Sequence, residues 1–253
     1  MAGVILCNNV AVQLGKPDSG FYLGPIRLEL ERGLITGLVG RNGAGKTTLI
    51  KTLVNQLEPE GGRVLYEGKT FEEDEVNIRR KVRAVLEEVL IAPRTSVEDF
   101  VDTIAYFEPW FDREQFKVWM KRFQLPLDLP ATEYSADMKK VFSLIFTICR
   151  GPEVLLLDEP TSGVDPVTRR QMLEVLQEFM EDENHTILFS THLTEDLDKI
   201  ADRVVLIENG KIVLDEEKEQ LKARFSGIKG RMPAIDEIME YVYVQKKERE
   251  VWR

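Results

Sequence analysis

The sequence predicts an α/β fold organised around a sheet of buried parallel strands. Three short apolar runs carry this prediction, because uninterrupted runs of this length are typical of strands that are covered on both faces. They lie at residues 34–39, 154–157 and 186–190. Each run is followed closely by residues that can do chemistry, at the sheet edge where open α/β folds place their ligands.

The first run leads into a glycine-rich loop that reads G-R-N-G-A-G-K-T. Its glycines let successive backbone N–H groups turn toward phosphates, and a helix beginning near Lys46 adds the positive end of its dipole. Lys46 is expected to reach the β and γ phosphates of ATP, and the Thr47 hydroxyl to ligate Mg²⁺. The predicted nucleotide-binding residues of the loop are Gly40, Arg41, Asn42, Gly43, Ala44, Gly45, Lys46, Thr47 and Thr48.

This loop predicts a P-loop NTPase with a RecA-like core. The alternative is a glycine turn that only joins a buried strand to a helix. The interval between Lys46 and Asp158 is much longer than one βαβ unit of roughly 30 residues, so an α-helical subdomain is expected to be inserted there. Alternating apolar residues at 26–30 predict an antiparallel β subdomain. Its other expected strands are residues 4–6, 10–12, 63–66 and 82–86.

The second apolar run ends at two adjacent carboxylates, Asp158 and Glu159. Successive side chains of a strand point to opposite faces, so the two groups can divide the work of ATP hydrolysis. Asp158 is assigned to Mg²⁺, and Glu159 to orienting and deprotonating the attacking water. A solvated strand terminus is the alternative, and the phosphate-binding loop elsewhere in the chain favours the catalytic interpretation.

Together these segments resemble the ATP-binding subunits of ABC transporters, from the first strands to about Leu221. Residues 155–160 read L-L-L-D-E-P, residues 161–166 resemble the D-loop of this family, and residues 190–192 resemble its switch histidine. The resemblance implies one ATPase domain over residues 1–225, with its core at 1–88 and 151–225 and its helical subdomain at about 89–150. Residues 226–253 are expected to form a short C-terminal helical extension.

The resemblance also implies roles for two further residues. His192 follows an apolar run and is therefore expected to project toward the same crevice as Asp158, where its imidazole would contact the γ-phosphate. Lys46, Glu159 and His192 are the predicted catalytic residues. Asp165 is expected at the face that meets a second ATPase subunit. Residues 106–112 and the helix predicted at 233–241 make the ATPases of bacterial type-2 exporters the most similar group.

The chain departs from the family pattern in its signature segment, which reads Y-S-A-D-M at residues 134–138. Ser135 is retained, but Ala136 and Asp137 replace two glycines at the surface that grips the partner's γ-phosphate. Their β-carbons hinder close backbone approach, and Asp137 adds negative charge beside a phosphate. Two interpretations stay open, pairing with a different ATPase subunit and a homodimer with a variant signature.

Two more positions differ from the family pattern. Glu87 stands where the family has glutamine, and a carboxylate there can still coordinate Mg²⁺. Tyr22 is the predicted adenine-stacking residue, since an aromatic face suits a base. Leu14 and Phe21 lie nearby as alternatives, because the insertion at residues 16–20 disturbs this region.

An aromatic cluster marks the expected helical insertion. Phe116, Trp119 and Phe123 fall on one helical stripe, which predicts the core of the subdomain. The alternative is that part of the cluster, including Trp110 and Phe111, lines a groove for a short helix of the membrane subunit.

Composition limits the possible functions further. The 253 residues carry a net charge of −10, which argues against general affinity for nucleic acid. No apolar stretch approaches the roughly 20 residues of a membrane span, and the start of the chain lacks a signal-peptide pattern. Cys7 and Cys149 are expected to be buried free thiols.

The expected protein is thus a peripheral ATPase at the cytoplasmic face of a bacterial membrane, working with separate permease subunits. Its predicted function is to power an ABC transporter, most consistent with an exporter, by nucleotide-driven dimer closure. The variant signature leaves an alternative, a nucleotide-gated binding module with little hydrolysis. A role in translation or DNA repair is disfavoured, because a second cassette and a coiled-coil insertion are both missing from the sequence pattern.

Overall fold

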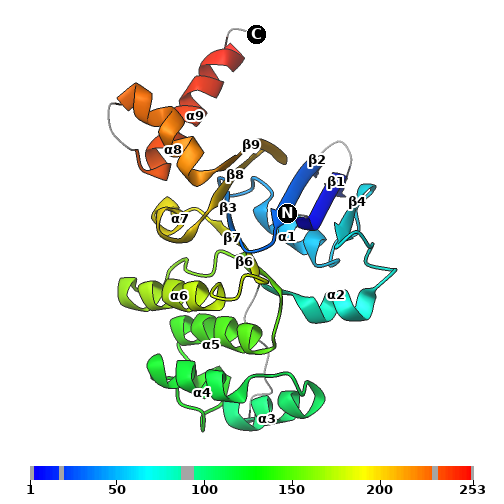
Figure 1. The fold of residues 1–253 in the computed structure, drawn as a ribbon, viewed down its shortest axis with the longest axis vertical. Coiled ribbons are helices and arrows are strands. Elements are labelled where there is room, and N and C mark those ends of the chain that lie inside the picture. The colour runs from blue at the N-terminus through cyan, green and yellow to red at the C-terminus, as the bar shows by residue number, and fades with distance from the viewer. Residues whose placement is uncertain (1–2, 17–19, 87–93, 230–232, 252–253) are drawn as a thin grey trace.

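A six-stranded sheet forms the centre of the computed structural model, which describes residues 3–16, 20–86, 94–229 and 233–251 (Figure 1). The strand order is β5-β6-β7-β3-β8-β9, and all neighbours are parallel except β8 and β9. The three apolar runs become the adjacent strands β6, β7 and β3, so their carboxyl ends meet at one edge, as predicted. The bounds are β3 Ile35–Val39, β5 Val82–Val85, β6 Val154–Asp158, β7 Thr186–Thr191, β8 Arg203–Glu208 and β9 Lys211–Glu217.

A second, antiparallel sheet has the order β2-β1-β4, with bounds β1 Gly3–Leu14, β2 Phe21–Glu31 and β4 Gly61–Tyr66. The alternation predicted for residues 26–30 is confirmed, since every second residue there is buried. Residues 4–6 and 10–12 belong to one strand rather than two, which bulges near Asn9, where φ is 55°.

The prediction that residues 82–86 extend this antiparallel region is wrong. They form β5, which pairs in parallel with β6, Val82 opposite Val154. The physical reason is the preceding helix α2, Glu75–Lys81, which carries the chain from the antiparallel sheet to the edge of the parallel one. A strand of four residues is too short for its own pattern to distinguish the two pairings.

Helices α3 (Val97–Phe107), α4 (Arg113–Arg122) and α5 (Ala136–Cys149) lie together between β5 and β6 in sequence. Phe116 and Trp119 are buried and Phe123 packs against the same core, which supports the core interpretation of the aromatic stripe. Phe111 is buried as well, whereas Trp110 is 45% exposed.

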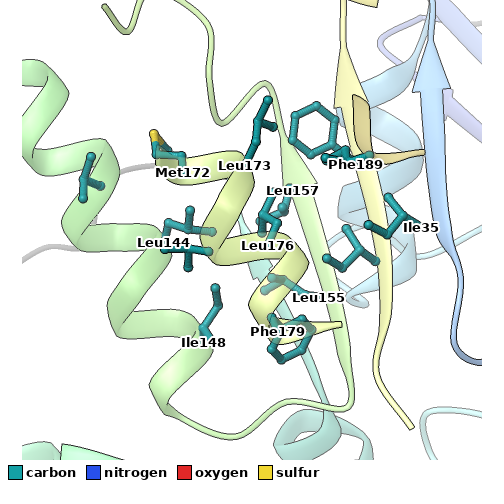
Figure 2. Packing of buried hydrophobic residues seen from close by; sticks show 14 of the residues in the cluster. Ile35, Leu144, Ile148, Leu155, Leu157, Met172, Leu173, Leu176, Phe179 and Phe189 are labelled. Atoms are coloured by element: carbon teal, nitrogen blue, oxygen red, sulfur yellow. The ribbon is translucent and has the colours of Figure 1, made fainter. Parts of the chain in front are cut away.

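Helix α5 connects this helical group to the rest of the molecule. It packs on α6, Pro166–Phe179, which in turn covers the parallel sheet. Figure 2 shows side chains of α5, α6 and β6 meeting in one apolar layer; those labelled are Leu144, Ile148, Leu155, Leu157, Met172, Leu173, Leu176 and Phe179. The helical group is therefore held to the nucleotide-binding core by continuous packing.

The hairpin between β8 and β9 turns at Asn209 and Gly210, which both have positive φ, as the Asn-Gly sequence predicts. Gly210 donates its N–H to the carbonyl of Ala44 at 2.9 Å and accepts from the N–H of Gly24 at 2.7 Å. The turn therefore contacts both the glycine-rich loop and strand β2.

Two helices, α8 (Lys218–Lys229) and α9 (Ile235–Val251), follow the last strand and lie at the end of the molecule away from α3 and α4 (Figure 1). The helix predicted at residues 233–241 is thus present but starts at Ile235 and runs further. The expected domain boundary at residue 225 falls inside α8. No helix in the described part of the chain combines the length and apolar character of a membrane span.

Candidate nucleotide-binding site

The glycine-rich loop joins β3 to α1, Lys46–Leu53, as predicted. Gly45 caps this helix with φ at 112°, a conformation that side chains other than glycine rarely adopt, and a β-carbon there would lie 2.9 Å from the Phe21 ring. The ammonium of Lys46 is buried in the loop, donates to the Gly40 carbonyl at 2.7 Å and lies 3.2 Å from Oε1 of Glu159. The loop therefore concentrates a cation and backbone N–H groups where phosphates can bind.

Two of the three residues predicted to hold Mg²⁺, Thr47 and Asp158, are in direct contact. Thr47 donates its hydroxyl to Oδ2 of Asp158, and Ser190 donates to Oδ1 of the same carboxylate at 2.6 Å. Hydroxyl and carboxylate oxygens are the ligands that Mg²⁺ prefers, so this donor set fits the ion. Ser190 is a residue that the sequence did not single out, although it stands at the end of an apolar run. It also accepts from the N–H of Glu159 at 3.1 Å.

Glu159 contacts the other two predicted catalytic residues, Lys46 and His192. Its backbone φ is 49°, an uncommon value for a side chain of this size. Oε2 lies 2.7 Å from Nδ1 of His192 and accepts from the His192 backbone N–H at 3.3 Å, while Oε1 faces Lys46. The structure thus brings Lys46, Glu159 and His192 together at the carboxyl ends of β3, β6 and β7.

A pocket of about 350 Å³ lies over the loop. Besides loop residues and Glu159, it is lined by Leu14 and Phe21. Tyr22, the predicted adenine-stacking residue, does not line this pocket, whereas the two alternatives, Leu14 and Phe21, do. The reason is strand geometry, because Phe21 and Tyr22 point to opposite faces of β2, and Phe21 pairs with Leu14. Glu87, the third predicted metal ligand, lies outside the described residues.

Comparison with known families gives a match to the ABC transporter family over residues 23–162, more than half of the chain. The chain belongs to the ABC transporter family. Its fold is that of the solved ABC ATPase cassettes, as the sequence predicted.

Named relatives agree with this assignment. The ABC transporter ATP-binding protein YtrB of Bacillus subtilis is 30% identical over 220 residues, which cover 82% of this chain and 73% of YtrB. The energy-coupling factor transporter ATP-binding protein EcfA2 of Ligilactobacillus salivarius is 28% identical, with 93% and 86% covered. A solved ATP-binding subunit of an ABC transporter shares the fold at a TM-score of 0.80 and 22% identity, covering 96% of this chain and 99% of that one.

The signature segment of this ABC cassette begins helix α5. Ser135 caps the helix and accepts from the Met138 N–H at 3.2 Å, and Ala136 is the first helical residue. Oδ2 of Asp137 accepts from the Asp165 N–H at 3.3 Å, and Lys140 donates to the Ser162 carbonyl. The signature segment and residues 162–165 are therefore tied to one another within the chain.

Asp165 itself caps α6, accepting from the N–H groups of Val167 and Thr168 at 3.0 and 3.1 Å. Hydrogen bonds from Thr168 hold the pKa of the Asp165 carboxyl below its usual value. The bond from the Thr168 side chain has the larger effect, followed by the bond from its backbone N–H. The carboxylate form of Asp165 is thus stabilised at the start of the helix.

Proposed function

We propose that this chain is the ATP-hydrolysing subunit of an ABC exporter, in which two cassettes close over ATP and drive separate membrane subunits. One observation carries the proposal, the convergence of Lys46, Asp158, Glu159 and His192 at one edge of the parallel sheet. The arrangement supplies a phosphate-binding cation, a metal-binding carboxylate and a base in contact with a histidine. These are the parts that phosphoryl transfer to water requires.

Each side chain has a distinct task in this proposal. Lys46 neutralises charge on the phosphates, and Glu159 accepts a proton from the attacking water through a carboxylate that His192 orients. Thr47 and Asp158 would hold Mg²⁺, which neutralises charge on the β and γ phosphate oxygens when bound. Phe21 and Leu14 provide an apolar wall against which the adenine base can rest.

Calorimetry with Mg·ATP tests the nucleotide site directly. The wild-type chain should bind, and Lys46→Ala should bind at least about tenfold more weakly, because charge-assisted hydrogen bonds contribute about 1.5–3 kcal/mol. Lys69→Ala is the matched control, since Lys69 is an exposed lysine that pairs with Asp74 at 2.7 Å. A folded wild-type chain that takes up no Mg·ATP would overturn the proposal.

We further propose that the second cassette is a different chain. Asp137 supports this, because its carboxylate lies beside residues 162–165 at the surface that would meet the partner's γ-phosphate, and like charges repel there. In a Glu159→Gln background, the chain alone should stay monomeric with ATP. Adding Ala136→Gly and Asp137→Gly should permit dimers, as measured by light scattering. ATP-dependent homodimers of Glu159→Gln alone would contradict the pairing with a different chain.

Asp137 also favours a second candidate function, a nucleotide-gated module with little hydrolysis. Turnover by the complex purified with its membrane subunits separates the two candidates. We propose that the chain works at the cytoplasmic face of a bacterial membrane and that its transporter moves cargo out of the cell. Export would be seen as ATP-dependent accumulation of cargo inside inverted vesicles.

A further inference from the structure

Helix α9 reaches back from the end of the chain to the glycine-rich loop. A pocket of about 440 Å³ separates the two, with Arg41 and His192 on one wall and Asp236, Glu240 and Tyr243 of α9 on the other. This pocket adjoins the nucleotide pocket, because Arg41 lines both. The C-terminal helix is therefore a neighbour of the ATP site, although the matched family region ends at residue 162.

Arg41 and Tyr243 join the two walls through a ring contact and a hydrogen bond between the Tyr243 hydroxyl and the Arg41 backbone. The guanidinium carbon of Arg41 lies 4.6 Å from the centroid of the Tyr243 ring, within the range of a cation–π interaction. Burial, together with Glu208, raises the pKa of the Tyr243 hydroxyl, against an opposing effect of Arg41. The ring is thus a neutral aromatic surface that is partly removed from water, which strengthens its attraction for a cation.

Tyr243 is presented from a firmly docked helix. Ile235, Ile238 and Met239 on the first turns of α9 are buried, and the N–H of Ile235 donates to Oδ2 of Asp198 at 3.1 Å. Tyr243 follows Met239 by one helical turn and so shares its face of α9. The helix that carries the ring is thus docked by contacts that do not involve Arg41.

Arg41, in contrast, is an exposed residue in the first turn of the loop. Its carbonyl accepts from the N–H of Ala44 at 3.0 Å, a hydrogen bond that shapes the loop around the phosphate pocket. Holding the Arg41 side chain limits the freedom of this turn before ATP arrives, and ordering a loop in advance reduces the entropy lost on binding.

We propose that Tyr243 is a positioning residue for ATP, which holds Arg41 and thereby the first turn of the phosphate-binding loop in its binding shape. The proposal rests on ATP binding to the glycine-rich loop. Replacing the ring should weaken Mg·ATP binding about twofold to fivefold, the size expected of a partly exposed cation–π contact. Turnover at saturating ATP should stay within about twofold, since the catalytic residues are untouched.

The test compares three variants in the full chain by calorimetry and steady-state kinetics. Tyr243→Leu keeps apolar volume but lacks the aromatic face and should raise both the Kd and the KM for ATP. Tyr243→Phe keeps the ring and loses only the hydroxyl that bonds the Arg41 backbone, so its Kd should stay closer to wild type than that of Tyr243→Leu. Tyr241→Ala is the matched control, because Tyr241 packs on Phe225 of α8 at 5.4 Å between ring centroids. It should remove this contact between α8 and α9 without changing the affinity for ATP, because Ile235, Ile238 and Met239 still dock α9.

A double-mutant cycle completes the experiment. In an Arg41→Ala background, Tyr243→Leu should have no further effect on the Kd, because the two side chains act as a pair. Equal affinity of Tyr243→Leu and wild type would overturn the proposal, as would equal weakening by Tyr241→Ala. A wild-type chain without ATP binding would instead overturn the proposed function, so the two failures are distinguishable.

Discussion

The Nδ1 atom of His192 lies 2.7 Å from Oε2 of Glu159, while the other oxygen of this carboxylate faces the Lys46 ammonium at 3.2 Å. Glu159 is thus held from both sides, by Lys46 at the start of α1 and by His192 just after β7. Its carboxylate has little freedom to rotate, which favours a fixed direction for accepting a proton.

Glu159→Gln is expected to lower ATP turnover by about 10² to 10⁴, because the amide cannot act as a general base. Binding of Mg·ATP should persist, since the loop and Asp158 are unchanged. Steady-state hydrolysis and calorimetry on the same preparation give the two quantities. Unchanged turnover would remove Glu159 from its assigned role.

His192→Ala is expected to lower turnover by up to about 10², the cost of a misplaced catalytic group. Affinity for Mg·ATP should change far less than turnover if His192 acts mainly by orienting Glu159. The comparison with Glu159→Gln is informative, because the double variant should be no slower than Glu159→Gln alone. Independent, multiplying losses would show that the two residues do not act as a unit.

Glu108→Gln is expected to destabilise the fold by about 1–3 kcal/mol at neutral pH, since Glu108 pairs with both Arg83 and Arg150. Burial acts to raise the pKa of Glu108, but Arg150 and Arg83 outweigh it and hold the pKa below its usual value. The stabilisation is therefore present above the unfolded-state pKa of about 4.3 and is lost as the pH falls through the folded-state pKa.

Urea unfolding of Glu108→Gln and wild type from pH 7 down to about pH 3 measures this difference, because the loss falls below the unfolded-state pKa. The difference in free energy of unfolding between the two chains should become smaller as the pH falls. Glu75→Gln is the matched control, because Glu75 pairs with Arg79 on an exposed helix face and should contribute only about 0.3–0.5 kcal/mol. A gap that is independent of pH would show that the carboxylate charge is not responsible.

Alanine substitutions at the adjacent residues Trp110 and Phe111 are expected to have different effects on stability and on coupling. Phe111 is 6% exposed, so Phe111→Ala should cost about 3–5 kcal/mol of stability. Trp110 is 45% exposed in the turn after α3, close in sequence to the exposed rings of Tyr106 and Phe107 at the end of that helix. Trp110→Ala should therefore leave stability nearly intact and reduce coupling to the membrane subunits. Thermal unfolding and transport in vesicles separate the two effects; normal coupling in Trp110→Ala would exclude this surface.

Cys7 and Cys149 are expected to resist thiol reagents in the folded chain. Both are buried free thiols, as predicted, and burial raises the pKa of Cys7 to about 12 and that of Cys149 as well. The reactive thiolate is therefore scarce at neutral pH. Both thiols should react with Ellman's reagent only after denaturation, and rapid labelling of native protein would contradict this.

Local pattern was sufficient for much of the site. The apolar runs before Gly40, Asp158 and His192 fix strand ends, and parallel strands bring those ends together. The sequence pattern was insufficient where the pairing of one strand with another decides which residues lie at the site. Choosing Phe21 over Tyr22 requires the pairing of β2 with β1, and the parallel pairing of β5 depends on where α2 leads the chain. The contact of Arg41 with Tyr243 joins distant segments and leaves no trace in either one.

The turn at Gly210 has a mechanical consequence. A β-carbon there would lie 2.1 Å from the Tyr22 carbonyl oxygen, so the turn approaches β2 more closely than any other residue type permits. Its hydrogen bonds to Ala44 and Gly24 connect the phosphate loop to strand β2, which carries Phe21. A displacement of β2 is therefore expected to reach the backbone of the phosphate loop directly through Gly210.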